Sequence, residues 1–182
     1  MVRVTGNFQS ESPLDPKAFE VLHAAFESGW ANPGKLSQSG ARAHQLRNQA
    51  LESIAASLGV AKDSILPFSS LSMGYFLGIQ GICDRSSTLI HGATDRKDVF
   101  AIAATMDHEI LPSDLHGKIL APKAQSPTSV LALHVANAET GVIQDCAEIV
   151  GRVNSDRVFL DATASGIRKP ISCEYSTAIF DS

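Results

Sequence analysis

The sequence predicts an α/β protein with a mainly parallel sheet and helices on both of its faces. From residue 65 onward, short apolar runs alternate with helical stretches, as they do in repeated strand–helix–strand units. The run Ser129–Val135 is apolar almost throughout, which is typical of a strand buried on both faces. Residues that commonly begin and end helices, such as Asp15-Pro16 and Gly59, stand at the ends of the helical stretches.

The first part of the chain is predicted to be helical. Asp15 and Pro16 begin a helix whose apolar side chains recur at spacings of three and four, and Gly29 ends it. Residues 30–40 contain Asn-Pro-Gly, a strong turn signal, and are predicted to be a loop. A second helix is expected over about 41–58, with Gly59 just after it.

The alternating part of the chain gives the strands and helices of the sheet. Helices are expected from about residue 74 to Cys83, over 97–106 and over 145–153. The predicted strands, the weak ones included, are Ile65–Phe68, Thr88–His91, Glu109–Leu111, Lys118–Ala121, Ser129–Val135, Val158–Asp161 and a last apolar run ending at Phe180.

Composition places the chain among ordinary globular proteins. Its 182 residues fit one domain, with 44% hydrophobic and 19% charged residues. A net charge of -4 indicates neither nucleic acid nor a membrane surface as a partner. The three cysteines have no metal-type spacing and form no disulfide framework, so we expect no metal site and a reducing, cytoplasmic location.

Polar side chains follow four of the predicted strands. They lie in Ser69–Gly74, Thr94–Asp98 and Asn137–Gln144, and at Asp161. The carboxyl ends of parallel strands meet at one edge, where ligands collect. Hydroxyls at a helix N-terminus, a cation, an amide and a carboxylate at that edge suit an anionic, aromatic ligand.

Each of these four groups also has a purely structural explanation. A serine before a helix is a common N-cap, charges at a helix start are commonly solvated, and an Asn can fix its own loop. Asp161 can cap the turn that follows it, and local sequence alone favours that role. His134 is expected to be a packing histidine rather than a base.

Six segments in order extend the pattern over nearly the whole chain. They are SPLDP at 12–16, ANPGKLSQSG at 31–40, SSLSMG at 69–74, TDRKDV at 94–99, NAETGVIQD at 137–145 and LDATAS at 160–165. With them the chain resembles the fold-type I, pyridoxal-phosphate (PLP) enzymes of aminotransferase class V, most closely the cysteine desulfurases. The pair ETGVIQ and DATAS is the most specific part of this resemblance.

The resemblance implies a truncated, three-layer large domain that binds PLP. Residues 1–182 would form a single domain, with 1–40 an N-terminal segment and entrance loop and 41–182 the cofactor-binding part. The parent enzyme would be a homodimer acting on a small amino acid, L-cysteine or a relative of it. The family's Schiff-base lysine would follow the last strand, and the chain ends at Ser182 before that position.

The resemblance also implies residue roles at the cofactor. Ser72 lies where the family binds the phosphate, and Ser70 and Leu71 adjoin it. Asp161 lies where an Asp pairs with the protonated pyridine nitrogen, which keeps the ring electron-withdrawing and makes this residue catalytic. Thr163 follows in the same segment and is assigned to the cofactor site.

Further assignments fall on the loops. Asn137 and Glu139 belong to the loop under the ring, and Asn32 belongs to the entrance that shapes substrate binding. Arg96 stands where the family has a histidine stacked on the ring, and it is assigned to the cofactor and to catalysis. An arginine can stack, but it is permanently charged and cannot act as an acid or base.

Other departures weaken the expected hold on the cofactor. Ala138 and Ala164 stand where the family has Asn and Gln, and each loss removes a hydrogen bond that is worth about 0.5–1.5 kcal/mol. Two functions therefore stay open. The chain is part of a PLP-dependent enzyme, or it is a degenerate, non-catalytic relative that serves as a binding or scaffold protein. A nucleotide-binding α/β domain ranks below both, because the glycine-rich phosphate loop is missing.

Overall fold

The structure, a computed structural model, describes residues 14–29, 31–122, 128–166, 171 and 173–181. Its backbone divides into two compact units, Met1–Leu66 and Pro67–Ser182. The sequence suggested a single domain with an internal boundary at residue 40, and that grouping stays a prediction. The two units are described separately below.

The first unit contains the two predicted helices. Helix α1 (Pro16–Glu27) begins as expected, because the Asp15 carboxylate accepts a hydrogen bond from the Lys17 amide at 2.8 Å. Helix α2 spans Gln38–Leu58 and ends at Gly59, whose φ of 68° is left-handed. Helix α2 starts earlier than the predicted residue 41, because the Ser37 hydroxyl caps the helix by accepting from the Gly40 amide at 3.0 Å.

Gly40 lies where the turn before α2 folds back on the helix. A Cβ at this position would lie 2.2 Å from the backbone oxygen of Lys35 and 3.0 Å from that of Asn32. Backbone atoms held in a turn cannot give way as the end of a side chain can. The turn and the first turn of α2 therefore depend on a residue without a side chain here.

Gly40→Ala is expected to destabilise the first turn of α2. We expect a loss of about 1–3 kcal/mol, the usual range for an overpacked site, measured by hydrogen exchange at the Gly40 and Ala41 amides. Gly151→Ala is the matched control, because a Cβ there meets nothing within 4 Å. Unchanged exchange at those amides in the Gly40 variant would contradict the packing described here.

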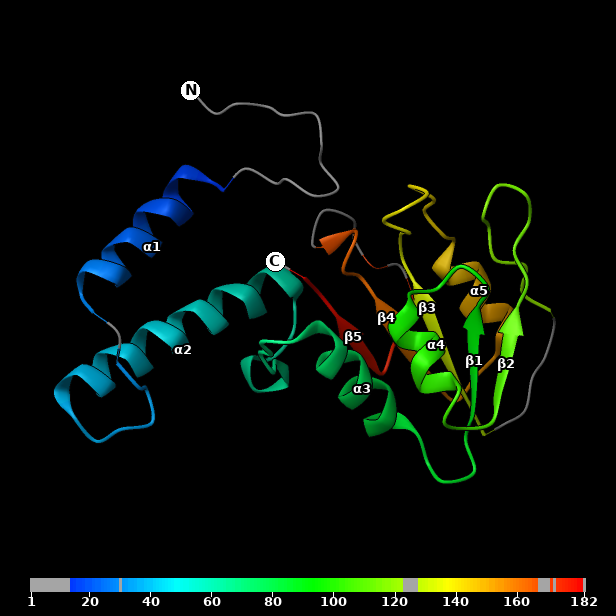
Figure 1. The fold of residues 1–182 in the computed structure, drawn as a ribbon, viewed down its shortest axis with the longest axis horizontal. Coiled ribbons are helices and arrows are strands. Elements are labelled where there is room, and N and C mark those ends of the chain that lie inside the picture. The colour runs from blue at the N-terminus through cyan, green and yellow to red at the C-terminus, as the bar shows by residue number, and fades with distance from the viewer. Residues whose placement is uncertain (1–13, 30, 123–127, 167–170, 172, 182) are drawn as a thin grey trace. The chain divides into compact units, whose positions relative to one another are not determined.

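The second unit is built on a parallel sheet of five strands in the order β2-β1-β3-β4-β5. Figure 1 shows α3 and α4 in front of this sheet and α5 behind it. The strands are β1 (Thr88–Gly92), β2 (His108–Leu111), β3 (Ser129–His134), β4 (Arg157–Asp161) and β5 (Thr177–Ile179). The helices are α3 (Leu71–Ile82), α4 (Lys97–Ala103) and α5 (Cys146–Val153).

Two apolar clusters hold the helices against the sheet. One cluster joins Tyr75 and Ile79 of α3 and Val99 of α4 to alternate strand residues such as Phe159. The other packs α5 against the opposite set of strand residues. All six residues of β3 are buried, as expected for a strand covered on both faces. The predicted three-layer α/β class is therefore confirmed.

Two predicted strands are wrong. Ile65–Phe68 belongs to none of the five strands; it follows a short 3-10 turn at Lys62–Ser64, and Leu66 is 69% exposed. An apolar run with proline in it was mistaken for a buried strand, although proline lacks the N–H that a sheet needs. Lys118–Ala121 contributes only an isolated antiparallel bridge between Ser113 and Ile119.

The predicted helix over residues 97–106 is shorter than expected. Helix α4 ends at Ala103, although apolar residues continue to Met106. The Thr105 amide bonds the Ile102 carbonyl, and the Met106 amide bonds the Ala103 carbonyl, so the chain leaves the helix through tight turns.

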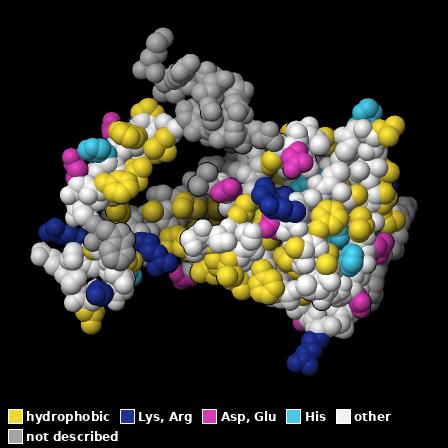
Figure 2. Space-filling view, viewed as in Figure 1, with side chains coloured by type: hydrophobic (Ala, Val, Ile, Leu, Met, Phe, Trp, Pro, Cys, Tyr) yellow, Lys and Arg dark blue, Asp and Glu magenta, His cyan; other side chains and the backbone are white. Residues whose placement is uncertain are grey.

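Helix α3 also presents an apolar outer face. Met73, Phe76 and Leu77, at spacings of three and four, are 44–51% exposed. Figure 2 shows hydrophobic side chains gathered over this helix. Among the residues that the structure describes, no helix is both long and apolar enough to cross a membrane.

Candidate functional site

The carboxyl edge of the sheet brings together segments that are far apart in the sequence. Strands β3 and β4 are paired so that His134 and Asp161, the last residue of each strand, stand side by side. Strand β1 ends at Gly92, and the segment after it leads into α4. The side-chain Nδ2 of Asn137 donates a hydrogen bond to the Thr94 carbonyl at 2.8 Å and connects the loops after β1 and β3. The predicted convergence of strand ends is therefore present.

Asp161 is a buried carboxylate at the tip of an inner strand. It is 4% exposed, and its Oδ1 accepts hydrogen bonds from the Thr163 amide at 2.9 Å and from the Thr163 hydroxyl at 2.6 Å. This is the turn-capping geometry that local sequence favoured. No hydrogen bond in the described part of the chain ends on the second oxygen, Oδ2. The cap therefore uses only one of the two carboxylate oxygens.

Tyr75 lies close to this carboxylate, and Arg96 lies close to Tyr75. Burial and the nearby Asp161 carboxylate raise the pKa of the Tyr75 hydroxyl above its usual value. That hydroxyl faces Asp161 closely enough to feel its charge, but it completes no hydrogen bond of normal geometry with a described residue. The Arg96 guanidinium lies 5.8 Å from the centre of the Tyr75 ring, within the range of a cation–π contact.

The predicted phosphate-binding segment opens helix α3. The Ser70 hydroxyl caps this helix, accepting from the Met73 amide at 3.4 Å. Leu71 is its first residue and packs against the apolar cluster on that face of the sheet. The Ser72 hydroxyl donates a hydrogen bond to Asp98 Oδ1 at 2.6 Å, across to α4. No sequence pattern indicates this contact.

Asn137 and Glu139 lie in the loop after β3. The Asn137 side chain is fully used within the protein, since its oxygen accepts from the Glu139 and Thr140 amides at 2.9 Å. Its amide nitrogen is used by Thr94, as described above. The Glu139 side chain is exposed. Both residues are at the expected edge, and Asn137 there fixes the loops.

A buried hydrogen-bond chain beside Asp161 was missed by sequence reasoning. Asp95 Oδ1 pairs with His134 Nδ1, and both side chains are 2% exposed. The other oxygen of Asp95 accepts from the Gly92 amide at 2.6 Å. Asp95 was hidden in a charged run that predicted a solvated helix start, and only its position after a buried strand could have marked it.

Gln144 determines which ring nitrogen of His134 carries the proton. Its Oε1 accepts from the Ile119 amide at 3.1 Å, and its Nε2 donates to the Gly117 carbonyl at 2.9 Å. The same Nε2 lies 3.2 Å from His134 Nε2, so it donates its second proton there. His134 therefore carries its own proton on Nδ1, toward Asp95. A histidine held in this way positions the loops, as the sequence indicated when it favoured packing over base chemistry.

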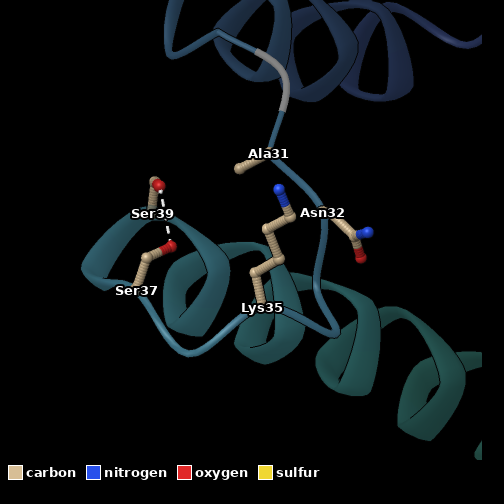
Figure 3. A pocket seen from close by; sticks show the side chains of 5 residues that line it. All are labelled: Ala31, Asn32, Lys35, Ser37 and Ser39. Carbon is tan, nitrogen blue, oxygen red and sulfur yellow. Dashed lines mark hydrogen bonds between the residues drawn. The ribbon is translucent and has the colours of Figure 1, made fainter.

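Asn32, the predicted substrate-binding residue, lies in the first unit. Its side-chain oxygen accepts from the Gly34 amide at 2.9 Å and so shapes the turn before α2. Together with Ala31, Lys35, Ser37 and Ser39 it lines a shallow pocket. Figure 3 shows the Lys35 side chain reaching toward Ala31 and the Ser37 and Ser39 hydroxyls facing each other. The relation of Asn32 to the sheet edge stays a prediction.

The residues at the sheet edge fit one end of PLP and not the other. The buried Asp161 suits a protonated pyridine nitrogen, and three buried polar atoms of the same unit, Tyr75 Oη, Thr94 Oγ1 and Arg96 Nε, have no hydrogen-bond partner within the described structure. Buried polar groups normally have partners, so unsatisfied ones indicate a ligand. At the phosphate end, however, a carboxylate already holds Ser72.

Comparison with known proteins supports the fold. No family profile and no curated protein sequence matches the chain. A structure of SspA in complex with cysteine matches 85% of this chain and 49% of its own, at 21% identity and a TM-score of 0.74. A NifS-like protein matches 95% of this chain and 53% of its own chain, at 18% sequence identity and a TM-score of 0.76. A C-DES variant with glycine covalently linked to the PLP cofactor matches 95% of this chain and 51% of its own chain, at 16% sequence identity and a TM-score of 0.70.

These matches agree with the architecture that the sequence predicts. The chain spans about half the length of the solved structures that it matches. At these identities the likeness concerns the fold. The parallel sheet, its layers of helices and its polar carboxyl edge give the chain the large-domain fold of the cysteine desulfurase-like, PLP-dependent enzymes.

Proposed function

We propose that the chain is the cofactor-binding part of a PLP-dependent enzyme of the cysteine desulfurase type. The observation that carries this proposal is Asp161, a carboxylate that is 4% exposed at the tip of an inner strand, with both hydrogen bonds from Thr163 on one of its oxygens. A buried carboxylate without a full set of partners is costly, and a pyridinium N–H would complete it. When bound, PLP supplies an electron-withdrawing ring.

The proposed roles of the other residues follow from their places around Asp161. Tyr75 lies beside the carboxylate and Arg96 lies beside Tyr75, so both would border the ring of the cofactor. Asn137 holds the loops after β1 and β3 at their observed spacing, and Glu139 would lie at their exposed rim. Ser70, Leu71 and Ser72 open α3 and would face the substituent of the ring on that side.

The substrate and the assembly are part of the same proposal. The matched structures include SspA with cysteine and a C-DES variant with PLP, which supports an amino acid, L-cysteine or a relative of it, as the substrate of the intact protein. The exposed apolar face on α3 supports a homodimer. The three cysteines are far apart and their spacing fits no disulfide framework, which supports a reducing, cytoplasmic location.

A second function is favoured by how the polar groups are used. Ser72 is bound by Asp98, and both ends of the Asn137 side chain are taken by the protein itself. A chain that satisfies its own site in this way could serve as a non-catalytic binding or scaffold protein. The two functions differ in one measurable property, which is the binding of a pyridine cofactor that depends on Asp161.

Asp161→Asn is expected to weaken the binding of pyridoxamine and pyridoxamine 5′-phosphate by about tenfold or more, because it removes a charge-assisted hydrogen bond. These amines carry no aldehyde and cannot form Schiff bases with surface lysines. Binding is measured by titrating their fluorescence with the protein. The variant is isosteric, so its Oδ1 can still accept from Thr163.

Asp107→Asn is the matched control, because Asp107 is an exposed carboxylate away from the carboxyl edge. It is expected to bind as the parent does. If the parent binds neither amine saturably, the scaffold function is favoured. If Asp161→Asn binds as tightly as the parent, Asp161 is not the partner of the ring nitrogen.

A further inference from the structure

We infer that this site selects the unphosphorylated form of its pyridine cofactor, because the Asp98 carboxylate stands at Ser72, where a phosphate would have to bind. The inference rests on the proposed function and deepens it by naming the ligand class. It would make pyridoxal or pyridoxamine, with an uncharged hydroxymethyl group, better ligands than their phosphate esters.

The contact between Ser72 and Asp98 is short and sheltered. The Ser72 hydroxyl lies 2.6 Å from Asp98 Oδ1, the distance of a strong hydrogen bond to a charged acceptor. The Asp98 side chain is only 11% exposed, so water screens its charge poorly. Ser70, the other hydroxyl at this helix start, accepts from the Met73 amide. The protein's own carboxylate thus takes the hydroxyl proton that an anionic ligand would need.

The charges around Asp98 do not compensate its negative charge enough to admit a phosphate group beside it. Arg96 Nε lies 3.9 Å from Asp98 Oδ2, too far for a hydrogen bond but close enough for the two charges to attract, so the Asp98 carboxylate offsets part of this cation's charge. Asp161 is a second carboxylate at the same edge, and the charge of Asp95 faces His134. Lys97 is adjacent in sequence, and its side chain is exposed. A phosphate group, which carries a charge of about −1.5 to −2 at neutral pH, would meet net repulsion.

The same arrangement suits a hydroxymethyl group. A neutral hydroxyl can donate a hydrogen bond to Ser72 Oγ, whose own proton is held by Asp98, without bringing a charge. The ring nitrogen would still meet Asp161. Ser72 and Asp98 therefore discriminate between a hydroxymethyl group and its phosphate ester, and the contact of the ring nitrogen with Asp161 is the same for both ligands.

The experiment compares two ligands that differ only by the phosphate. Pyridoxamine and pyridoxamine 5′-phosphate are titrated against the whole chain by fluorescence, as above. We expect the parent to bind pyridoxamine at least about tenfold more tightly. Asp98→Asn is expected to strengthen binding of the phosphate ester by about tenfold and to change pyridoxamine binding by less than about twofold, because it removes the charge and keeps the shape.

A second substitution separates charge from general disturbance. In the Asp98→Asn background, Ser72→Ala is expected to reduce the gain for the phosphate ester, since the Ser72 hydroxyl can donate to the phosphate once the carboxylate charge is gone. Asp107→Asn, which lowers the net negative charge equally, should leave the ratio of the two affinities at the parent value. Far-UV circular dichroism confirms that each variant is folded.

The possible failures are distinguishable. If the parent binds pyridoxamine 5′-phosphate as tightly as pyridoxamine or more tightly, and Asp161→Asn weakens both, the selectivity inference is overturned and the proposed function stands. An equal gain for both ligands in Asp98→Asn also overturns the inference. If the parent binds neither ligand, the proposed function and the inference built on it both fail.

Discussion

Asp95→Ala is expected to lower the free energy of unfolding by about 2–6 kcal/mol, because it leaves two buried donors without acceptors at about 1–3 kcal/mol each. The donors are the Gly92 amide, 2.6 Å from Asp95 Oδ2, and His134 Nδ1, which pairs with Asp95 Oδ1. Both side chains of the pair are 2% exposed, so water cannot replace the lost carboxylate without opening the structure. This loss is a large part of the roughly 5–15 kcal/mol that stabilises a typical domain.

The measurement is urea unfolding followed by far-UV circular dichroism. Asp95→Asn should also be destabilised, because its amide can accept from only one of the two donors and points its own N–H groups at the other. Asp107→Ala serves as the control, and as an exposed substitution it should stay within about 0.5 kcal/mol of the parent. A similarly small change in Asp95→Ala would show that the pair contributes little to stability.

Phe159→Ala is expected to cost about 3–5 kcal/mol, the usual range for removing a buried aromatic ring. Phe159 is 0% exposed on β4, and its ring centre lies 5.7 Å from that of Tyr75. The ring also covers Gly78 of α3, where an added Cβ would come within 2.6 Å of Phe159 Cε2. Its removal therefore opens a cavity between α3 and the sheet, and urea unfolding measures the loss.

A double substitution tests this packing directly. Gly78→Ala alone should destabilise by about 1–3 kcal/mol, because the ring that it meets is enclosed. In the Phe159→Ala background the clash is gone, and alanine is a better helix residue than glycine by about 0.5–1 kcal/mol. Gly78→Ala should then be neutral or stabilising. Equal costs in the two backgrounds would mean that the ring and Gly78 do not interact.

The fold was predictable from sequence because its signals are local. Strand β3 is apolar almost throughout, and Asp15, Gly59 and Asp145 mark helix ends where the structure has them. The prediction failed where a segment with strand-like residues has no neighbouring strand to pair with. Ile65–Phe68 has strand-like side chains, but a strand exists only when a neighbour pairs with it, and sequence does not show pairing.

The candidate site was predictable in its place and not in its contacts. The rule that ligands collect at the carboxyl ends of parallel strands identified Asp161 and the segments around it. The contact of Ser72 with Asp98 joins positions 26 residues apart, and that of Asp95 with His134 joins positions 39 apart. Tyr75 was not identified, because a tyrosine inside an apolar helical stretch has no distinguishing spacing. Such pairs depend on how helices and strands stack, which no spacing rule contains.

The side chain of Gln144 has a consequence for how the chain folds. Its single amide group bonds the segment around Gly117 and Ile119 and the imidazole at the tip of β3, which in turn reaches Asp95 after β1. Ile119 and Gly117 lie 25 and 27 residues from Gln144, and Asp95 lies 39 residues from His134, so these bonds form only after distant segments have met. Contacts of such long range close late and slow the folding of parallel sheets. We therefore expect this edge to be among the last regions to become ordered during refolding.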